Sequence, residues 1–406
     1  MQESSFERFL EEMLDLGDDY SIDFIEKDDE EEVIHIHIKY NKAYYIENGE
    51  KYKLYDLAPE RMWQHLGWFQ YRCYIFCRLP RYINKDNKVK TIQAVFANPM
   101  KGYTLLFASY VIEVLLAIKV QHTTAKLFKT SSYIVRTIME DAVENGLNMR
   151  GDVSDLKNVS LDEKSFLKGH KYATILIDSD KDYVVEMTEG RKGENVIALF
   201  FSATNQEELP QISRVNIDMW EPYIKTMKKI APNAKQVHDR FHLSKKLSDA
   251  IDKTRKQEVK TEPLLKNNKF TVLKNQENRT EKQQASFELI NKANLKTAQA
   301  WKIRENFKDI FSINTIEEIE DAYSCWIKDA LDCGIKYIKD VVETFERHRE
   351  GIMNAFITKT TSGKHENTNG RIQSVLAKAR GFRNFERFRI NIMFHFSNLN
   401  LFPLKT

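Results

Sequence analysis

Acidic residues at or near the ends of apolar segments are the chemically most informative feature of this sequence. Asp162 lies within the β-prone segment 159–166, Asp218 ends the segment 215–218, and Asp239 follows soon after a third such segment. Carboxylates at strand ends converge when their strands are neighbours in one sheet. Three or four converging carboxylates can hold two Mg²⁺ ions about 4 Å apart and stabilise the attacking and leaving oxygens of a phosphoryl transfer.

The order of the elements around these residues predicts a single mixed sheet. Three consecutive strands are followed by alternating helices and strands, expected at 159–166, 172–178, 183–188, 195–206, 215–218, 221–230 and 235–237. This order is typical of an RNase H-like sheet, in which the first and fourth strands are neighbours. Asp162 and Asp218 are therefore expected to face one another, whereas Asp178 and Asp180 read as turn or cap residues.

A third carboxylate is sought on a helix after the sheet, and Glu366 is the candidate. It lies among small and amide residues in a segment that reads as a helix from Ser362 onward. The continuation, Ala379 to Arg389, alternates Arg with Phe. That pattern suits phosphates and stacked bases, although the packing of an amphipathic helix would produce a similar one. Most of the chain between 244 and 356 is predicted to be helical.

Three helices are predicted before the sheet, at 105–117, 123–128 and 131–145. Ala125, Val135 and Ile138 stand where a helix-turn-helix places its small contact residue and two core residues. Lys129 occupies the turn position that usually holds Gly, so an ordinary helical bundle is the alternative. Further upstream, the alternation in Val33–Ile38 predicts a strand, and the segments 52–55 and 71–79 are expected to form a strand pair.

The charge is unevenly distributed along the 406 residues, which contain 42% hydrophobic and 30% charged residues and suffice for two or three domains. The first 32 residues contain 14 acidic and 2 basic side chains and so carry a net charge of −12. The formal net charge of the whole chain is +3, so the remaining residues carry +15. A basic body fits a polyanionic partner better than a neutral metabolite. Four Cys are too few for a disulfide framework in a chain of this length. The sequence contains no run of about 18 apolar residues, the length that a membrane-spanning helix requires.

Several motifs in order resemble the ISL3 family of bacterial insertion-sequence transposases. They are Leu161-Asp162-Glu163, Lys168 to Thr174, Ile217 to Tyr223, Asp239 to His242, and His365 to Asn369 with Gly381 to Asn384. The resemblance implies an RNase H-like DDE domain with a helical insertion, which transposes a DNA element using two Mg²⁺ ions. It assigns Asp162, Asp218 and Glu366 as catalytic metal ligands, with Asp239 and His242 as supporting residues. Asp239 remains the alternative to Asp218 as the second Asp.

The resemblance fails at the N-terminus, where family members usually carry a zinc ribbon. Its second ligand pair would match Asn84 and Asn87, and no first pair of Cys is visible near Tyr40 to Tyr45. Asn is a poor zinc ligand, so we expect a degenerate ribbon-like domain without zinc. Cys73 and Cys77 are interpreted as small core residues.

Contacts with DNA are expected from basic, polar and aromatic side chains of the helices. The candidates are Lys129, Ser132, Arg136, Trp301, Arg304, Arg371, Arg380 and Arg383. Trp301 is named because an aromatic residue in such an insertion can hold a flipped base in related enzymes, although a Trp in a helical domain is more often a core residue.

The overall expectation is an α+β protein with six segments. They are an acidic extension (1–32), a small β-rich domain (33–100), a helix-turn-helix domain (101–150), the RNase H-like domain (151–243 and 357–406) and its all-α insertion (244–356). We expect a cytoplasmic, nucleoid-associated prokaryotic transposase that binds the terminal inverted repeats of its element and target DNA as a homodimer or larger synaptic complex, without a membrane. The alternatives are an inactive DNA-binding protein derived from a transposase and an RNase H-like nuclease.

Overall fold

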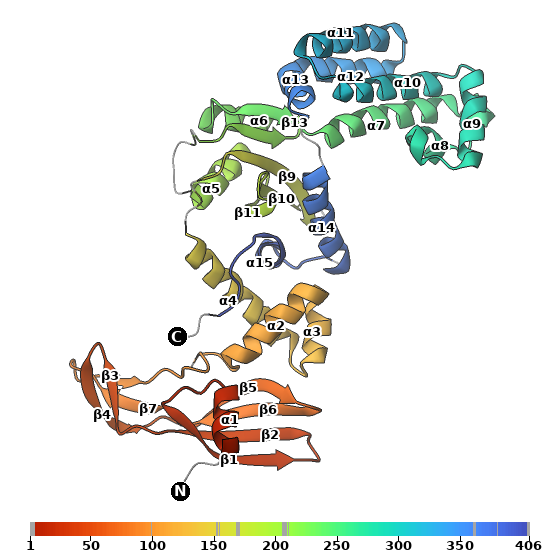
Figure 1. The fold of residues 1–406 in the computed structure, drawn as a ribbon. Coiled ribbons are helices and arrows are strands. Elements are labelled where there is room, and N and C mark those ends of the chain that lie inside the picture. Colours follow the sequence, from red (N-terminus) through yellow and green to blue (C-terminus); the bar gives the residue numbers. More distant parts are fainter. Residues whose placement is uncertain are drawn as a thin grey trace. The chain divides into compact units, whose positions relative to one another are not determined.

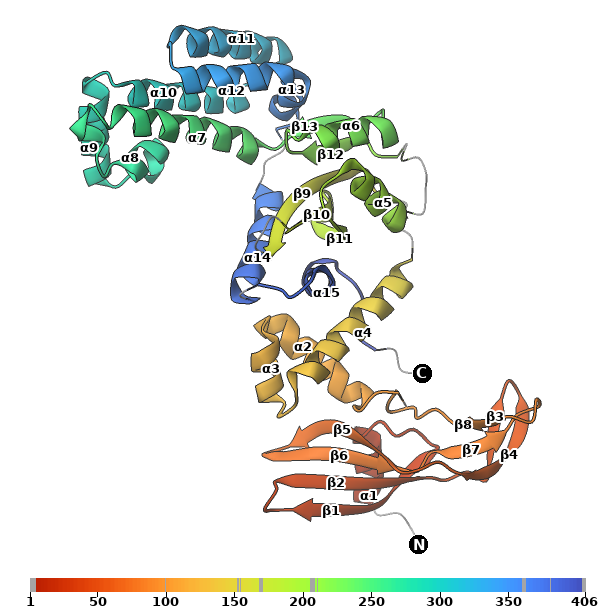
Figure 2. The ribbon, with the colours of Figure 1, turned by 180° about the vertical axis from the view of Figure 1, so that it is seen from behind.

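The computed structural model describes residues 5–98, 100–151, 153, 155–167, 171–204, 209, 211–359, 363–379 and 381–403; for 5, 6 and 363–369 it describes the backbone. The chain forms two compact units (Figures 1 and 2), of which one comprises Met1–Gly151 with Ile390–Thr406 and the other Asp152–Arg389. Within the described residues, no helix combines the length and apolar character that a membrane crossing requires.

The first unit contains a four-stranded sheet with the order β1-β2-β6-β5, accompanied by α1 (Ser5–Met13). Its strands are β1 (Tyr20–Asp28), β2 (Val33–Tyr40), β5 (Arg61–Trp68) and β6 (Tyr71–Cys77). Alternate residues of β2 enter a core with Trp63, Cys73 and Cys77. Burial raises the pKa of each thiol to about 12, so both Cys are inert core residues, as expected.

The acidic N-terminal segment is part of this sheet, which corrects the expectation of a separate extension at 1–32. β1 pairs antiparallel with β2 from Tyr20 opposite Tyr40 to Asp28 opposite Val33. Leu14, Leu16 and Tyr20 are buried in the same core. The strand escaped prediction because only its first residues are buried and the remainder faces solvent, as an edge strand can.

A second small sheet has the order β3-β4-β7-β8, so the expected pairing of 52–55 with 71–79 is wrong. Its strands are β3 (Tyr44–Glu47), β4 (Glu50–Leu57), β7 (Pro80–Ile83) and β8 (Val89–Thr91). Tyr45 and Tyr52 pack against Tyr82, with ring centroids 4.9 and 5.2 Å apart. Asn84 closes the β7–β8 turn, since its Oδ1 accepts from the amides of Asp86 and Lys88.

Three helices complete the first unit at nearly the predicted positions: α2 (Leu105–Ile118), α3 (Gln121–Leu127) and α4 (Ser132–Arg150). Ser131 caps α4, because its hydroxyl accepts from the amide of Ile134. Ala125, Val135 and Ile138 are buried as expected. Lys129 adopts φ +47°, the left-handed conformation that makes Gly common at this turn position.

The second unit is built on a five-stranded mixed sheet with the order β11-β10-β9-β12-β13. The strands are β9 (Asn158–Leu167), β10 (Lys171–Asp178), β11 (Tyr183–Glu189), β12 (Arg214–Ile217) and β13 (Lys235–His238). The first three pair antiparallel, whereas β12 is parallel to both β9 and β13. Helices α5 (Gly193–Thr204) and α6 (Glu221–Ile230) bury their apolar faces with Val159, Leu161 and Ile217. The element order predicted from the sequence is confirmed.

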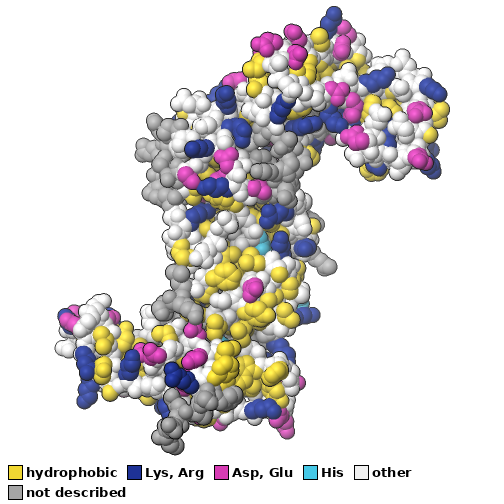
Figure 3. Space-filling model, viewed as in Figure 1, with side chains coloured by type: hydrophobic (Ala, Val, Ile, Leu, Met, Phe, Trp, Pro, Cys, Tyr) yellow, Lys and Arg dark blue, Asp and Glu magenta, His cyan; other side chains and the backbone are white. Residues whose placement is uncertain are grey.

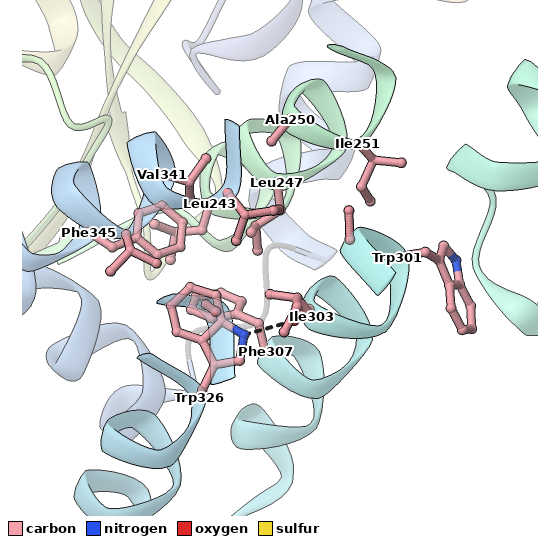
Figure 4. Packing of buried hydrophobic residues seen from close by; sticks show 14 of the residues in the cluster. Leu243, Leu247, Ala250, Ile251, Trp301, Ile303, Phe307, Trp326, Val341 and Phe345 are labelled. Atoms are coloured by element: carbon pink, nitrogen blue, oxygen red, sulfur yellow. Dashed lines mark hydrogen bonds between the residues drawn. The ribbon is translucent and has the colours of Figure 1, made fainter. Parts of the chain in front are cut away.

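A helical region follows the sheet, and Figure 4 shows its apolar core. The helices are α7 (Arg240–Glu258), α8 (Lys269–Leu273), α9 (Glu281–Lys292), α10 (Lys296–Asp309), α11 (Ile316–Asp332), α12 (Lys336–Arg347) and α13 (Arg349–Thr358). Three short 3₁₀ turns join them, at Pro263–Leu265, Gln276–Asn278 and Ile310–Ser312. Within the core, the indole of Trp326 donates to the carbonyl of Ile303 (2.8 Å). On the face seen in Figure 3, basic and acidic side chains are interspersed over this region.

The chain ends with α14 (Gly363–Ala379) and α15 (Phe385–Phe396). Phe388 of α15 stacks on Phe166 of β9, with centroids 5.5 Å apart. Arg389 makes two hydrogen bonds to Glu186 of β11, at 2.8 and 2.6 Å. The boundary between the units falls directly after Arg389, so Ile390–Thr406 groups with the first unit rather than with the sheet, contrary to the expected segment 357–406.

Replacing Arg389 with Met should destabilise the second unit by about 2–4 kcal/mol, because Glu186 would keep a largely buried charge without its partner. The two side chains are only 21% and 11% exposed. Urea unfolding followed by circular dichroism would measure the change. Arg383→Met, at an exposed position, is the control and should shift stability by less than about 0.5 kcal/mol. Equal unfolding midpoints for the two variants would contradict a structural role for the Arg389–Glu186 pair.

Candidate active site on β9 and at the ends of β12 and β13

Strand register places three Asp residues level with one another. The last paired residues of β12 and β9 are Asn216 and Ser160. Continuing the same register by two residues along each segment brings Asp218 level with Asp162. Ile217 pairs with His238, and one residue further Asp239 is level with Asp218. The amide of Asp239 donates to the carbonyl of Ile217 (3.4 Å), which extends the ladder to this point.

Asp162 is largely buried and holds a cation from its own strand. Its side chain is 12% exposed, and Oδ2 lies 2.7 Å from Nζ of Lys164. Residues two apart in a strand share one face, so the ion pair follows from the strand itself. Its Oδ1 accepts from the amide of Glu163 (2.8 Å). The carboxylate is thus neutralised and oriented in the absence of any metal.

Asp218 is more open and contacts the start of α7. Its side chain is 43% exposed, and Oδ2 lies 3.5 Å from Nδ1 of His242. Oδ1 accepts from the amide of Met219 (2.6 Å). His242 therefore lies against the carboxylate that the sequence favours as the second Asp, which fits the expected supporting position.

Asp239 has a structural task that accounts for its position. It is the N-cap of α7, and its Oδ1 accepts from the amide of Phe241 (2.8 Å). A capping Asp stabilises a helix start by about 1 kcal/mol. By contrast, the N-cap of α6 is Trp220, so Asp218 does not cap the helix that follows it.

Glu163, next to Asp162 in β9, is a further carboxylate with a shifted pKa, although the sequence did not single it out. Burial raises the pKa of its carboxyl, as do the negative charges of Asp162 and Asp218, while the guanidinium of Arg191 opposes the rise. Arg191 Nη1 lies 3.3 Å from Oε1 of Glu163. Glu163 and Asp162 are adjacent in β9, so their side chains leave the strand on opposite faces. The signal available in the sequence was the adjacent pair Asp162-Glu163.

Glu366 lies on α14, and its side chain is outside the described residues. Among the residues that are described, no group of three His, Cys, Asp or Glu is arranged as a metal site. Asp162 and Asp218 nevertheless fit a hard divalent cation, because carboxylate oxygens are its preferred ligands and these two stand level on neighbouring strands.

Trp301 and Arg304, expected as DNA contacts, are core residues of the helical region. Trp301 is 8% exposed, and its indole donates to the carbonyl of Lys274 (3.1 Å). Arg304 is 4% exposed and donates to the carbonyls of Leu273 and Lys274. Each polar group is used within the fold, so neither side chain is presented to DNA in this structure. The core alternative considered for Trp301 is the one observed (Figure 4).

The remaining expected DNA contacts differ in accessibility. Lys129 donates to the carbonyl of Gln70 (2.7 Å) and to Glu32, so its charge is already partnered. Ser132 is exposed at the start of α4, and Arg136 is half-buried beside Glu140 (3.3 Å).

At the C-terminal end of the chain, Arg371 and Arg383 are exposed, whereas Arg380 lies outside the described residues.

Comparison with known proteins assigns the family. The family model for the ISL3 group of DDE transposases, described as "Transposase", matches residues 159–392 and thus more than half of the chain. The protein belongs to the ISL3 family of DDE transposases.

Two relatives show how far the similarity extends. The transposase for insertion sequence element IS1557 of Mycobacterium tuberculosis is 26% identical over 365 residues, which cover 82% of this chain and 81% of the relative. The transposase for insertion sequence element IS1001 of Bordetella parapertussis is 24% identical over 281 residues, or 66% of this chain and 68% of the relative. The IS1557 alignment is longer than the family match of 159–392, so the similarity extends beyond that region.

Membership of the family implies DNA binding and divalent-metal catalysis in general.

Replacing Lys164 with Met should tighten the binding of Mg²⁺ by roughly three- to tenfold, because the ammonium competes for the Asp162 carboxylate that a metal would use. The Mg²⁺ dependence of the thermal unfolding midpoint measures this without reference to activity. Lys181→Met, which removes an exposed pair with Asp155 in the same unit, is the matched control and should leave the dependence unchanged. Weaker Mg²⁺ binding by Lys164→Met would show that Lys164 supports the metal rather than competing with it.

Proposed function

We propose that this protein is the transposase of a bacterial insertion sequence, which binds the ends of its element, cuts the DNA in the presence of Mg²⁺ and joins the freed ends to a target. The observation that carries this proposal is the parallel pairing of β12 with β9, whose last pair, Asn216 and Ser160, lies two residues before Asp218 and Asp162. Family membership supports the same activity, and the named relatives are transposases of insertion sequences.

The sheet order supports an RNase H-like catalytic domain. Three antiparallel strands followed by two parallel ones, with the first strand next to the fourth, match the order expected for that fold. In this interpretation α7 to α13 form the all-α insertion, and α14 returns to supply Glu366. The catalytic set is then Asp162, Asp218 and Glu366.

The chemistry is divided between the metal and the chain. Two Mg²⁺ ions, when bound, would lower the pKa of the attacking water and offset the charge on the attacking and leaving oxygens. Asp162 holds a fixed position because Glu163 donates a backbone hydrogen bond to it. Asp218 is oriented by the amide of Met219 and by His242. Lys164 pairs with Asp162 and would be available to contact a DNA phosphate if a metal took that carboxylate.

Recognition of the element ends is assigned to a helix-turn-helix formed by α3 and α4. The left-handed Lys129 turn, the buried Ala125 and the apolar contacts of α4 support this assignment. At the start of α4, Ser132 and Tyr133 are exposed, the latter by 65%, and Arg136 lies beside the Tyr133 ring. Two ends must be brought together, so a dimer or larger synaptic complex is expected.

Replacing Asp162 or Asp218 with Asn, or Glu366 with Gln, should abolish cleavage of a duplex that carries the element end in Mg²⁺. The loss should exceed the roughly 10–100-fold effect of removing a supporting partner of a metal ligand. Asp239→Asn should stay within about tenfold of the wild-type rate, because Asn also caps a helix well. Gel analysis of cleaved end fragments measures all four variants.

Two controls make that comparison decisive. Asp180→Asn, in the turn where Asp180 accepts from Asn158, should cut at the wild-type rate. A retardation assay should show unchanged binding of the element end by every variant. The opposite ranking, with Asp239→Asn inactive and Asp218→Asn active, would transfer the second metal ligand to Asp239. A wild-type protein that binds the ends but never cuts them would favour the alternative function, an inactive DNA-binding descendant of a transposase.

Replacing Arg136 with Ala should weaken binding of the element end and lower the slope of log K against log salt by about 1, as expected for the loss of one phosphate contact. Fluorescence anisotropy at several salt concentrations measures both effects. The control is Arg383→Ala, which removes one basic side chain outside α3 and α4. This variant should discriminate between the element end and unrelated DNA as well as the wild type does. If Arg136→Ala binds the element end like the wild type at every salt concentration, α4 is not the recognition helix.

A further inference from the structure

Trp220 is a solvent-exposed aromatic residue next to the carboxylates. It lies two residues beyond Asp218 and is 40% exposed, although Trp side chains are mostly well buried. Its carbonyl accepts from the amides of Tyr223 (3.0 Å) and Ile224 (3.2 Å) at the start of α6. The backbone that carries the ring is therefore fixed at the end of β12.

The ring is connected to the carboxylates through a single cation. The guanidinium carbon of Arg191 lies 5.0 Å from the centroid of the Trp220 ring and 4.5 Å from that of Tyr172. The same guanidinium lies 3.3 Å from Oε1 of Glu163, the residue next to Asp162 in β9. Arg191 thus occupies one side of the Trp220 ring, places a positive charge at this edge of the site and leaves a large part of the indole open to solvent.

The proposed cleavage of a phosphodiester at Asp162 and Asp218 means that the ligand near the Trp220 ring is DNA. Successive nucleotides of one strand are separated by a rise of about 3.4 Å, so a phosphate held at Asp162 and Asp218 brings its neighbouring bases into reach of Trp220. An aromatic ring stacks on any base, because every base has a π face. A base inside a duplex already stacks on its neighbours, so only an unpaired base offers a free face.

We propose that Trp220 binds an unpaired base of the DNA strand next to the phosphate that is cut, with Arg191 holding the ring in place. This inference rests on the proposed function, because it requires DNA at the carboxylates. It assigns to Trp220 a sequence-tolerant stacking contact and predicts that the protein prefers element ends whose strands are locally separated. Trp301, the Trp named from the sequence, is buried and takes no part.

The test compares two DNA probes that carry the inverted repeat bordering the gene. One is fully paired, and the other has three unpaired nucleotides at the cut position with 2-aminopurine as the first of them. Binding is measured by anisotropy and stacking by 2-aminopurine fluorescence, both in EDTA so that no cleavage occurs. The variants are Trp220→Leu, which keeps an apolar side chain without a ring, and Trp220→Phe, which keeps a ring.

The matched control is Phe270→Leu, because Phe270 of α8 is also an exposed aromatic residue (67%) with a cation nearby, Lys269 at 5.8 Å. The wild type and Phe270→Leu should bind the unpaired probe about tenfold more tightly than the paired one, a difference in affinity typical of one base stacked on an aromatic ring. Both proteins should also quench the 2-aminopurine fluorescence of the unpaired probe. Trp220→Leu should lose both effects, and Trp220→Phe should keep most of them.

Two results would overturn the inference: an undiminished preference and quenching in Trp220→Leu, or no preference in the wild type. Cleavage of the paired probe by the wild type in Mg²⁺ is scored separately. If that cleavage is absent, the proposed function fails. If cleavage occurs and Trp220→Leu still prefers the unpaired probe, the stacking contact alone fails.

Discussion

The parallel pairing of β12 with β9 is the constraint on which the candidate active site depends. It brings together Asp162 and Asp218, which are far apart in the sequence, and it requires α5 to cross over and pack on the sheet. The register is held by burial, because Val215 and Ile217 enter the apolar core on one face. A slip of one residue would turn Asp218 toward that core and an apolar side chain toward the site, so the hydrophobic pattern of a short strand fixes the position of a carboxylate.

Clustered carboxylates repel one another, and the chain offsets this repulsion with cations of its own. Lys164 lies against Asp162, Arg191 against Glu163, and His242 next to Asp218. The three side chains come from different elements: β9, the loop before α5, and the first turn of α7. The three are also unequal, because the Lys164 pair is the most buried and has the shortest contact. Asp162, Glu163 and Asp218 are therefore each engaged by a side chain of the same unit.

The sequence predicted the central sheet well and the surfaces poorly. The strands of the second unit are recognisable because continuous apolar runs alternate with polar turns, and Asp162 and Asp218 follow from that order. β1 was missed because its outward residues are acidic and only its start is buried. Trp301 was named as a DNA contact because an aromatic residue in such an insertion can hold a flipped base in related enzymes, and Arg304 is one of its basic neighbours. A buried guanidinium that satisfies the carbonyls of Leu273 and Lys274 depends on a loop thirty residues away, which local patterns cannot reveal. Glu163 stayed hidden because its importance arises from pairing with Arg191 across the sheet.

The turn between β7 and β8 is closed by hydrogen bonds within the turn itself. Where the family resemblance would place a ligand pair, Asn84 accepts two backbone hydrogen bonds across the turn, and Asn87 takes the left-handed conformation at φ +58°. An Asn side chain closes such a turn by imitating a backbone segment, which is the local task that a coordinated metal would otherwise perform. The neighbouring strands are held by the packing of Tyr45 and Tyr52 on Tyr82. Neither contact involves a thiolate, so we expect any dependence of the protein on divalent ions to arise at the carboxylates of the second unit.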